Sequence, residues 1–450
     1  MPHIFIDAGY GLFASVGIPR STQIFTVPAS ALLNVLTLAP HYPTTRPRLS
    51  SVQLISLHLA LYRPTQQADS LDPIFGPYIS VLPREFDFHP LAWICKRRNG
   101  SANSGSKARL LKLLPTEIAM ELEKIASRFY GDRTLIFDYL RDNYDLLRKT
   151  RWKGLAPQLP EHETTDLEDA YLWGWLNVNT RCIYHRIRKS KSDHDNMTLC
   201  PILDFANHTT QLPFMLPPSS DAEIWDTPMR SKPGENFTLI SPASTATTSG
   251  EELYLKYGSH ANKTLFVEYG FVDTFSRMSL LDGSSPGEVD VQYVTEGHFK
   301  KRGKLGEWME DRLREEGYWG DWTIHSSPAP AYPSYRLITA LRLYSLWPPS
   351  VTDISADAEQ HLDSWRDTTL GKRDTISPEN ESSWRAMLSK ICRSIISNAR
   401  FMISRLDSEP CLTSDDGSGK AMKKNIELLW QEQLYVAMGV ENSLREGVQF

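Results

Sequence analysis

The sequence predicts an α+β fold in which a β-rich unit is split by a helical insert and followed by an all-helical domain. Short β-type runs broken by Gly and Pro fill residues 3–38 and return at 198–273. Helical periodicity dominates between these stretches and again after residue 273. Because 450 residues exceed one compact core, we expect a domain over 1–273, with its insert at about 45–185, and a helical domain over 274–450.

The β-rich stretches are short but have the composition of strands. Residues 4–6 and 23–27 are rich in β-branched and aromatic side chains and are separated by turn-forming Gly and Pro residues. Residues 236–242 and 253–257 have the same character and are joined by a turn-forming segment at 244–250. We therefore expect short strands from both stretches to build the β unit.

The helical stretches carry apolar residues at a spacing of three to four positions. In the insert, one such run covers residues 118–129 after a helix start at Pro115, and a second covers 167–178. The tail has amphipathic segments at 337–344, 384–402 and 426–440.

Charge and composition narrow the function classes. The chain has 49 basic and 54 acidic residues and no long basic run, so we expect no nucleic-acid partner. Residues 1–7 do not resemble a signal segment, and no stretch reaches the roughly 18 apolar residues of a spanning helix. We therefore expect a cytoplasmic and/or nuclear protein that does not contact a membrane. The five scattered cysteines lack a C-x-x-C spacing, which favours free thiols and no metal site.

Three short motifs occur in a fixed order. They are Gly9-Tyr10-Gly11-Leu12-Phe13, Asp204-Phe205-Ala206-Asn207-His208 and Gly250-Glu251-Glu252-Leu253-Tyr254-Leu255-Lys256-Tyr257-Gly258. Each motif alone is weak, because a Gly-x-Gly string is often a plain turn between strands and Asn-His is often a turn as well. Their order and spacing together are the informative observation.

This ordered set resembles the signature motifs of SET-domain protein methyltransferases. The split by a helical insert and the helical tail are similar to the Rubisco large-subunit methyltransferase-like branch of that family. Further similar strings are Pro77 to Pro83 followed by Trp93, Val178 to Arg181, Pro201 to Asp204, and Tyr269 to Val272. The resemblance covers roughly the first 270 residues. It implies a SET β-fold with a knot-like C-terminal segment, S-adenosyl-L-methionine as cofactor, and a tail that resembles a substrate-binding domain.

The resemblance also implies roles for single residues. Tyr257 matches the catalytic tyrosine whose hydroxyl orients the incoming amine and the methyl group; the plain alternative is an ordinary tyrosine at a strand end. Asn207 and His208 match the pair that contacts the cofactor, and Asn207 also threads the chain into the knot-like arrangement. A lone histidine in a loop is more often a structural group.

Further residues follow from the same resemblance. Tyr10, Gly11 and Leu12 match the opening cofactor segment, where glycine lets the backbone approach a ligand closely. Arg181 either binds the cofactor carboxylate or caps the C-terminus of its helix. Tyr269 and Phe205 are assigned to the substrate channel, with core packing as the alternative for Tyr269.

The chemistry of amine methylation sets one further requirement. The ordinary pKa of a lysine side chain lies about 3.4 units above pH 7. Removing its proton at pH 7 therefore costs roughly 4.6 kcal/mol unless the site lowers the pKa. We therefore expect an apolar, aromatic channel beside the cofactor sulfonium.

These observations favour an S-adenosylmethionine-dependent protein-lysine N-methyltransferase, a monomer, acting on a non-histone substrate such as a ribosomal protein or translation factor. One alternative is a protein-histidine methyltransferase on the same scaffold. Another is a catalytically silent SET scaffold that binds partner proteins. The sequence reaches Gly9 almost at once and has Tyr10 where relatives commonly carry a charged residue, and both features favour the silent scaffold.

Overall fold

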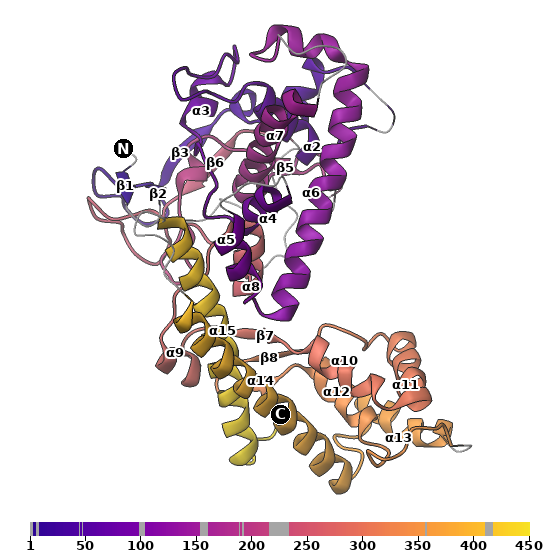
Figure 1. Cartoon of the computed structure of the whole chain (residues 1–450). Helices are drawn as coiled ribbons and strands as arrows, with labels where there is room; N and C mark the ends of the chain where they lie inside the picture. The colour runs from indigo at the N-terminus through magenta and orange to yellow at the C-terminus, as the bar shows by residue number, and fades with distance from the viewer. Residues whose placement is uncertain are drawn as a thin grey trace. The chain divides into compact units, whose positions relative to one another are not determined.

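The computed structural model describes residues 3–5, 9–44, 46, 48–98, 104–153, 161–188, 190, 193–215, 234–355, 358–409 and 417–450. The chain divides into two compact units (Figure 1). The first consists of Met1–Ala92 and Lys124–His260, and the second of Trp93–Glu123 and Ala261–Phe450. The α+β class is confirmed, while the domain division at residue 273 stays a prediction.

The strands of the first unit form antiparallel pairs. β1 (His3–Phe5) pairs with β2 (Gly9–Gly11), and β4 (Ile183–Tyr184) pairs with β5 (Met197–Thr198). β3 (Gln23–Val27) pairs with β6 (Phe237–Ile240), so that Val27 lies opposite Phe237. The two β-rich stretches of the sequence therefore meet, as predicted.

One predicted strand takes a different form. Residues 253–257 do not join a ladder; the segment instead makes single bridges on both sides, from Glu252 to Phe13 and from Leu255 to His208 and Met215. The β-type composition of this segment reflects extended backbone, but its neighbours are loops that offer only one or two hydrogen-bonding positions each.

Helices cover the first unit. They are α1 (Val35–Leu38), α2 (Ser51–Leu61), α3 (Gly76–Val81), α7 (Glu161–Arg181) and the short turns η1 (Ala29–Ala31), η2 (Ala39–His41), η3 (Tyr144–Lys149) and η4 (Leu203–Phe205). α4 (Pro90–Arg98) and α6 (Thr116–Asp142) contribute residues to both units. The predicted helices over 118–129 and 167–178 are thus confirmed as α6 and α7.

The start of α2 is fixed by its own sequence. The Ser50 hydroxyl accepts the Gln53 N–H at 3.2 Å, and the Gln53 side chain accepts the Ser50 N–H at 2.9 Å. This reciprocal pair satisfies two donors that the helix itself leaves unpaired. Because most of α2 is apolar and buried, the helix packs deeply against α7.

Gly174 marks the closest approach of α7 to α2. A Cβ at this position would lie 2.5 Å from the carbonyl oxygen of Ser56, a residue that is fully buried. Since that backbone cannot move without shifting α2, we expect Gly174→Ala to destabilise the protein by about 1–3 kcal/mol, measured by chemical denaturation. Gly131→Ala in α6 is the control, because nothing lies within 4 Å of its Cβ position. This control should gain about 0.5–1 kcal/mol from helix propensity, and equal effects of the two changes would contradict the close crossing.

The second unit is mainly helical. Its elements are α5 (Ser104–Leu111), α8 (Asn262–Thr264), η5 (Leu265–Tyr269), α9 (Arg277–Leu281), α10 (Gln292–Lys300), α11 (Gly303–Glu315), α12 (Tyr335–Tyr344), α13 (Ala358–Thr369), α14 (Pro378–Ser408) and α15 (Gly417–Arg445). The long helices α14 and α15 pack along each other (Figure 1). The three amphipathic segments predicted for the tail are confirmed as α12, α14 and α15.

The prediction of an all-helical tail missed one sheet. β7 (Glu288–Asp290), β8 (Thr323–His325) and β9 (Tyr332–Pro333) form a three-stranded antiparallel sheet in the order β7-β8-β9. Strands of two or three residues are too short to show an alternating apolar pattern, so sequence periodicity could not detect them.

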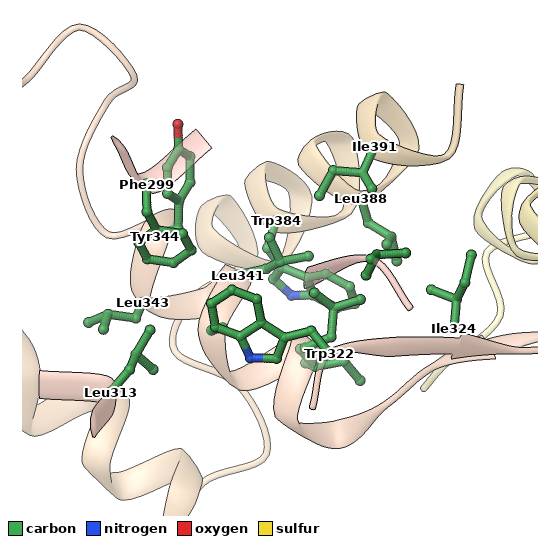
Figure 2. Close-up of a cluster of buried hydrophobic side chains, with 14 of the residues drawn as sticks. Phe299, Leu313, Trp322, Ile324, Leu341, Leu343, Tyr344, Trp384, Leu388 and Ile391 are labelled. Atoms are coloured by element: carbon green, nitrogen blue, oxygen red, sulfur yellow. The ribbon is translucent and has the colours of Figure 1, made fainter. Parts of the chain in front are cut away.

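Aromatic side chains from several elements fill the core of the second unit (Figure 2). The rings of Phe299 and Trp322 stack with centroids 5.6 Å apart, and Tyr344 meets Phe299 edge to face at 5.2 Å. Trp322 and Trp384 are at most 1% exposed. These rings join α10, α12 and α14 to the residue that precedes β8 and give the tail a core of its own.

Two other expectations concern cysteines and membranes. Cys95, Cys182, Cys200 and Cys392 are free thiols, while Cys411 lies outside the described residues. In the described ranges, no three His, Cys, Asp or Glu side chains are grouped to hold a metal ion. None of the helices described here is both long enough and apolar enough to span a bilayer.

Candidate active site

The three sequence motifs lie side by side in the first unit. The N–H of Leu253 donates to the carbonyl of Leu12 at 2.8 Å, which joins the last motif to the opening one. The N–H of Leu255 donates to the carbonyl of Asn207 at 2.9 Å, and Leu255 also forms a parallel bridge with His208. The last motif therefore runs between the other two and holds them together.

Gly11 is the tightest point of this junction. It is buried, and a Cβ there would lie 2.6 Å from Oε1 of Glu252 and 3.2 Å from Nδ2 of Asn207. The Asn207 amide donates to the same Glu252 oxygen at 2.6 Å. A larger residue at position 11 would displace this pair, so glycine is required by close approach rather than by a turn. Glu252 was not among the predicted site residues.

Tyr257 is fixed against the middle motif at both ends. Its hydroxyl donates to the carbonyl oxygen of Ala206 at 2.9 Å. Its backbone N–H donates to Nδ1 of His208 at 3.1 Å, and the two rings lie 5.0 Å apart. Because Nδ1 accepts this bond, neutral His208 carries its proton on Nε2. The Tyr257 side chain thus has a defined orientation beside the Asn207-His208 pair.

Arg181 reaches from the end of α7 into the middle motif. Its Nη1 donates to the Asp204 carbonyl at 2.7 Å and to Asp204 Oδ2 at 3.2 Å. The guanidinium lies 5.8 Å from the centre of the Phe205 ring, and Phe205 meets Tyr10 edge to face at 5.8 Å. The structure therefore brings Arg181, Phe205 and Tyr10 into one connected group.

The carboxyl group of Asp204 is the buried centre of this group. Its side chain is 1% exposed, and Oδ2 also accepts the Tyr78 hydroxyl at 2.9 Å. Burial raises the pKa of Asp204, while Arg181 and the Tyr78 hydroxyl oppose that shift. Asp204 Oδ1 and Arg181 Nε are buried without a hydrogen-bond partner among the described residues. A bound group could therefore satisfy one donor and one acceptor here.

The entry to the middle motif is strained. Ile202 has φ 76° and ψ −50°, which a β-branched residue rarely adopts. Its side chain is 52% exposed, so apolar burial does not drive the conformation. The turn directs the chain into η4, which carries Asp204 and Phe205. Strained backbone of this kind is typical of ligand sites.

Tyr269 is the one predicted site residue in the second unit. It ends η5, and Gly270 follows it with φ 86°. The Tyr269 ring lies 6.1 Å from that of Phe271, and the Asn425 side chain donates to the Gly270 carbonyl at 3.3 Å. α15 therefore holds the segment that carries Tyr269.

Several known proteins are similar to this chain over most of its length, although no family model matches it. Ribosomal lysine N-methyltransferase set11 of Schizosaccharomyces pombe is 25% identical over 373 residues, 82% of this chain and 77% of that protein. SET domain-containing protein 4 of Homo sapiens is 22% identical over 451 residues, covering 97% and 85% of the two chains. Ribosomal lysine N-methyltransferase 2 of Saccharomyces cerevisiae is 26% identical over 316 residues, covering 66% and 58%.

Solved structures share the fold. The SET domain of LSMT bound to lysine and AdoHcy matches 99% of this chain and 86% of its own, with a TM-score of 0.60 and 17% identity. Rubisco LSMT bound to AdoMet matches with a TM-score of 0.58 and 16% identity over 99% and 87% of the two chains. With the shared fold, the relatives and the three joined motifs, the chain is similar to SET-domain proteins of the Rubisco large-subunit methyltransferase-like branch.

Proposed function

We propose that this protein is an S-adenosyl-L-methionine-dependent protein-lysine N-methyltransferase that acts on a non-histone protein. The observation that carries the proposal is the junction of Gly11, Asn207 and Tyr257 in one region of the first unit. Relatives named as ribosomal lysine methyltransferases and a structural neighbour crystallised with lysine support it. They favour a ribosomal protein as the substrate class.

The residues fit the cofactor by their chemistry. S-adenosyl-L-methionine carries an amino-acid group with one carboxylate and one ammonium. The unpaired Nε of Arg181 suits the carboxylate, and the unpaired Oδ1 of Asp204 suits the ammonium. We assign cofactor binding to Tyr10, Gly11, Leu12, Arg181, Asn207 and His208, add Asp204 to this set, and assign Phe205 and Tyr269 to the substrate channel.

The protein's part in the reaction is positioning. The cofactor, when bound, supplies an electrophilic methyl group. The Tyr257 hydroxyl donates its hydrogen bond to the Ala206 carbonyl, so the lone pairs of its oxygen remain to accept an N–H from the incoming amine. The ring of Phe205, which we assign to the substrate channel, excludes water there, and this desolvation favours the reactive neutral amine over the charged ammonium. Tyr257 is thus the catalytic residue, and it acts by orientation.

Calorimetry with S-adenosyl-L-methionine tests the cofactor assignment. We expect the parent protein to bind and Arg181→Gln to bind about ten-fold more weakly, because a charge-assisted bond to the carboxylate is lost. Arg20→Gln, at an exposed position, should bind like the parent. A folded parent protein that binds no cofactor would overturn the proposal. Incubation with methyl-labelled cofactor and a cell extract, followed by mass spectrometry, then identifies the acceptor as lysine or histidine.

We propose a cytoplasmic and/or nuclear monomer that contacts neither nucleic acid nor membrane, with a domain at 1–273 and a helical substrate-binding domain at 274–450. The excess of acidic over basic residues, 54 against 49, supports the absence of a nucleic-acid partner. Size-exclusion chromatography with light scattering tests whether the protein is a monomer.

A further inference from the structure

A groove opens on the first unit beside the last motif, and none of the predicted site residues lines it. Its volume is about 530 Å³, within the range of small-ligand pockets. Pro213 and Phe214 give it accessible apolar surface, and the buried side chains of Met215 and Leu253 lie behind them. Glu251 and Glu252 supply carboxylates, and the described lining contains no lysine, arginine or histidine. The groove therefore combines an apolar surface with negative charge.

Glu252 connects this groove to the cofactor segment. Its carboxylate accepts the Asn207 amide at 2.6 Å. It also accepts the hydroxyl of Tyr254, another lining residue, and this bond raises the pKa of Tyr254 to about 12. These two bonds hold the carboxylate at a fixed position between Asn207 and the groove. The Glu252 carboxylate therefore loses little conformational freedom when a cation binds in the groove.

The charge of the groove decides which side chain it fits. Two carboxylates favour the charged form of a bound amine and raise its pKa. Methyl transfer needs the neutral amine, so the groove is unsuited to the lysine that is modified. It suits a basic side chain that stays protonated and binds without reacting.

We propose that the groove binds a lysine or arginine side chain of the polypeptide substrate, at a position next to the modified lysine. The aliphatic stem of such a side chain lies on Pro213 and Phe214, and its charged end lies against Glu251 and Glu252. This inference rests on the proposed function, because it treats the groove as part of the substrate-binding surface.

Two lysine substitutions in one loop test this inference. Ala246 lines the groove, whereas Ala243 does not, and both residues are exposed. Ala246→Lys and Ala243→Lys change the net charge equally, so only a specific role of the groove distinguishes them. Fluorescence anisotropy with a labelled tri-lysine peptide is the measurement. We expect binding to weaken about ten-fold or more in Ala246→Lys and to stay within about two-fold of the parent in Ala243→Lys.

A second pair of substitutions removes a negative charge without adding side-chain volume. Glu251→Gln should weaken tri-lysine binding several-fold, and Glu235→Gln, an exposed acid outside the groove, should not. A labelled tri-glutamate peptide should not bind the parent. Equal affinities within both pairs, or a parent protein that binds neither peptide, would overturn the inference.

Cofactor calorimetry on the same proteins separates the two proposals. Intact cofactor binding with equal peptide affinities would remove the groove from the substrate surface and leave the methyltransferase assignment standing. Loss of tri-lysine binding only in Ala246→Lys and Glu251→Gln, with cofactor binding unchanged, would support the groove. Absence of cofactor binding in the folded parent protein would instead overturn the methyltransferase assignment, whatever the peptide does.

Discussion

Tyr257→Phe should lower the turnover of methyl transfer by about 10²–10³-fold while changing cofactor affinity by less than about three-fold. The substitution removes only the hydroxyl, which donates to the Ala206 carbonyl and which we propose receives the amine. The ring and the backbone N–H that bonds His208 Nδ1 remain. Because we assign cofactor binding to the surrounding residues, cofactor affinity should survive the change.

Single-turnover assays with methyl-labelled cofactor, together with calorimetry, separate these two effects. Tyr293→Phe is a matched control, because Tyr293 is 56% exposed on α10 and has no part in the proposed site. Equal turnover of Tyr257→Phe and the parent protein would discredit the role of Tyr257. A loss of cofactor affinity as large as the loss of turnover would indicate that the hydroxyl serves binding rather than orientation.

Glu432→Gln should stabilise the protein at pH 8 by on the order of 4 kcal/mol. Glu432 is buried on α15, and burial raises the pKa of its carboxyl to about 8. Its carboxyl accepts the Glu288 N–H at 3.3 Å and the Asn262 side chain. A raised carboxyl pKa favours folding fully below the ordinary value near 4.5, and this contribution is lost as the pH rises toward 8. Glutamine keeps the size and an acceptor but needs no proton.

Thermal unfolding between pH 4 and 8 measures this effect. The difference between Glu432→Gln and the parent should grow from near zero at about pH 4.5 to its largest value near pH 8. Burial also raises the pKa of Glu117, to about 7. The stability of the Glu432→Gln variant should therefore keep a smaller dependence on pH. Glu446→Gln, at an exposed position, is the control and should follow the parent curve. Parallel curves for Glu432→Gln and the parent would mean that Glu432 does not take up a proton on folding.

The long elements of the fold could be predicted from sequence, and the short ones could not. The apolar spacing in 118–129 and 167–178 gave α6 and α7 because a helix repeats its pattern over many residues. β7, β8 and β9 have two or three residues each, which leaves no period to detect. The segment 253–257 looked like a strand, but its pairing depends on loops far away in the chain.

The candidate site shows the same division between local and distant information. The three short sequence motifs indicated Gly11, Asn207 and Tyr257 as site residues, and the structure brings these residues together. Glu252 lies inside a motif, yet its bond to Asn207 appears only in three dimensions. Tyr78 bonds Asp204 across 126 residues of sequence, and no local signal could have paired them.

The distant pairing of strands in the first unit also determines when the site can form during synthesis. β3 has its partner in β6, and the neighbouring bond from the Thr22 N–H to the Ser241 hydroxyl spans 219 residues. At about 5–20 residues per second, the emerging β3 waits on the order of tens of seconds for β6. Its unpaired edge is exposed to chaperones and to other nascent chains during that time. A truncated mRNA that ends before the codon for residue 237 would therefore yield a chain without this strand pair and without the candidate active site.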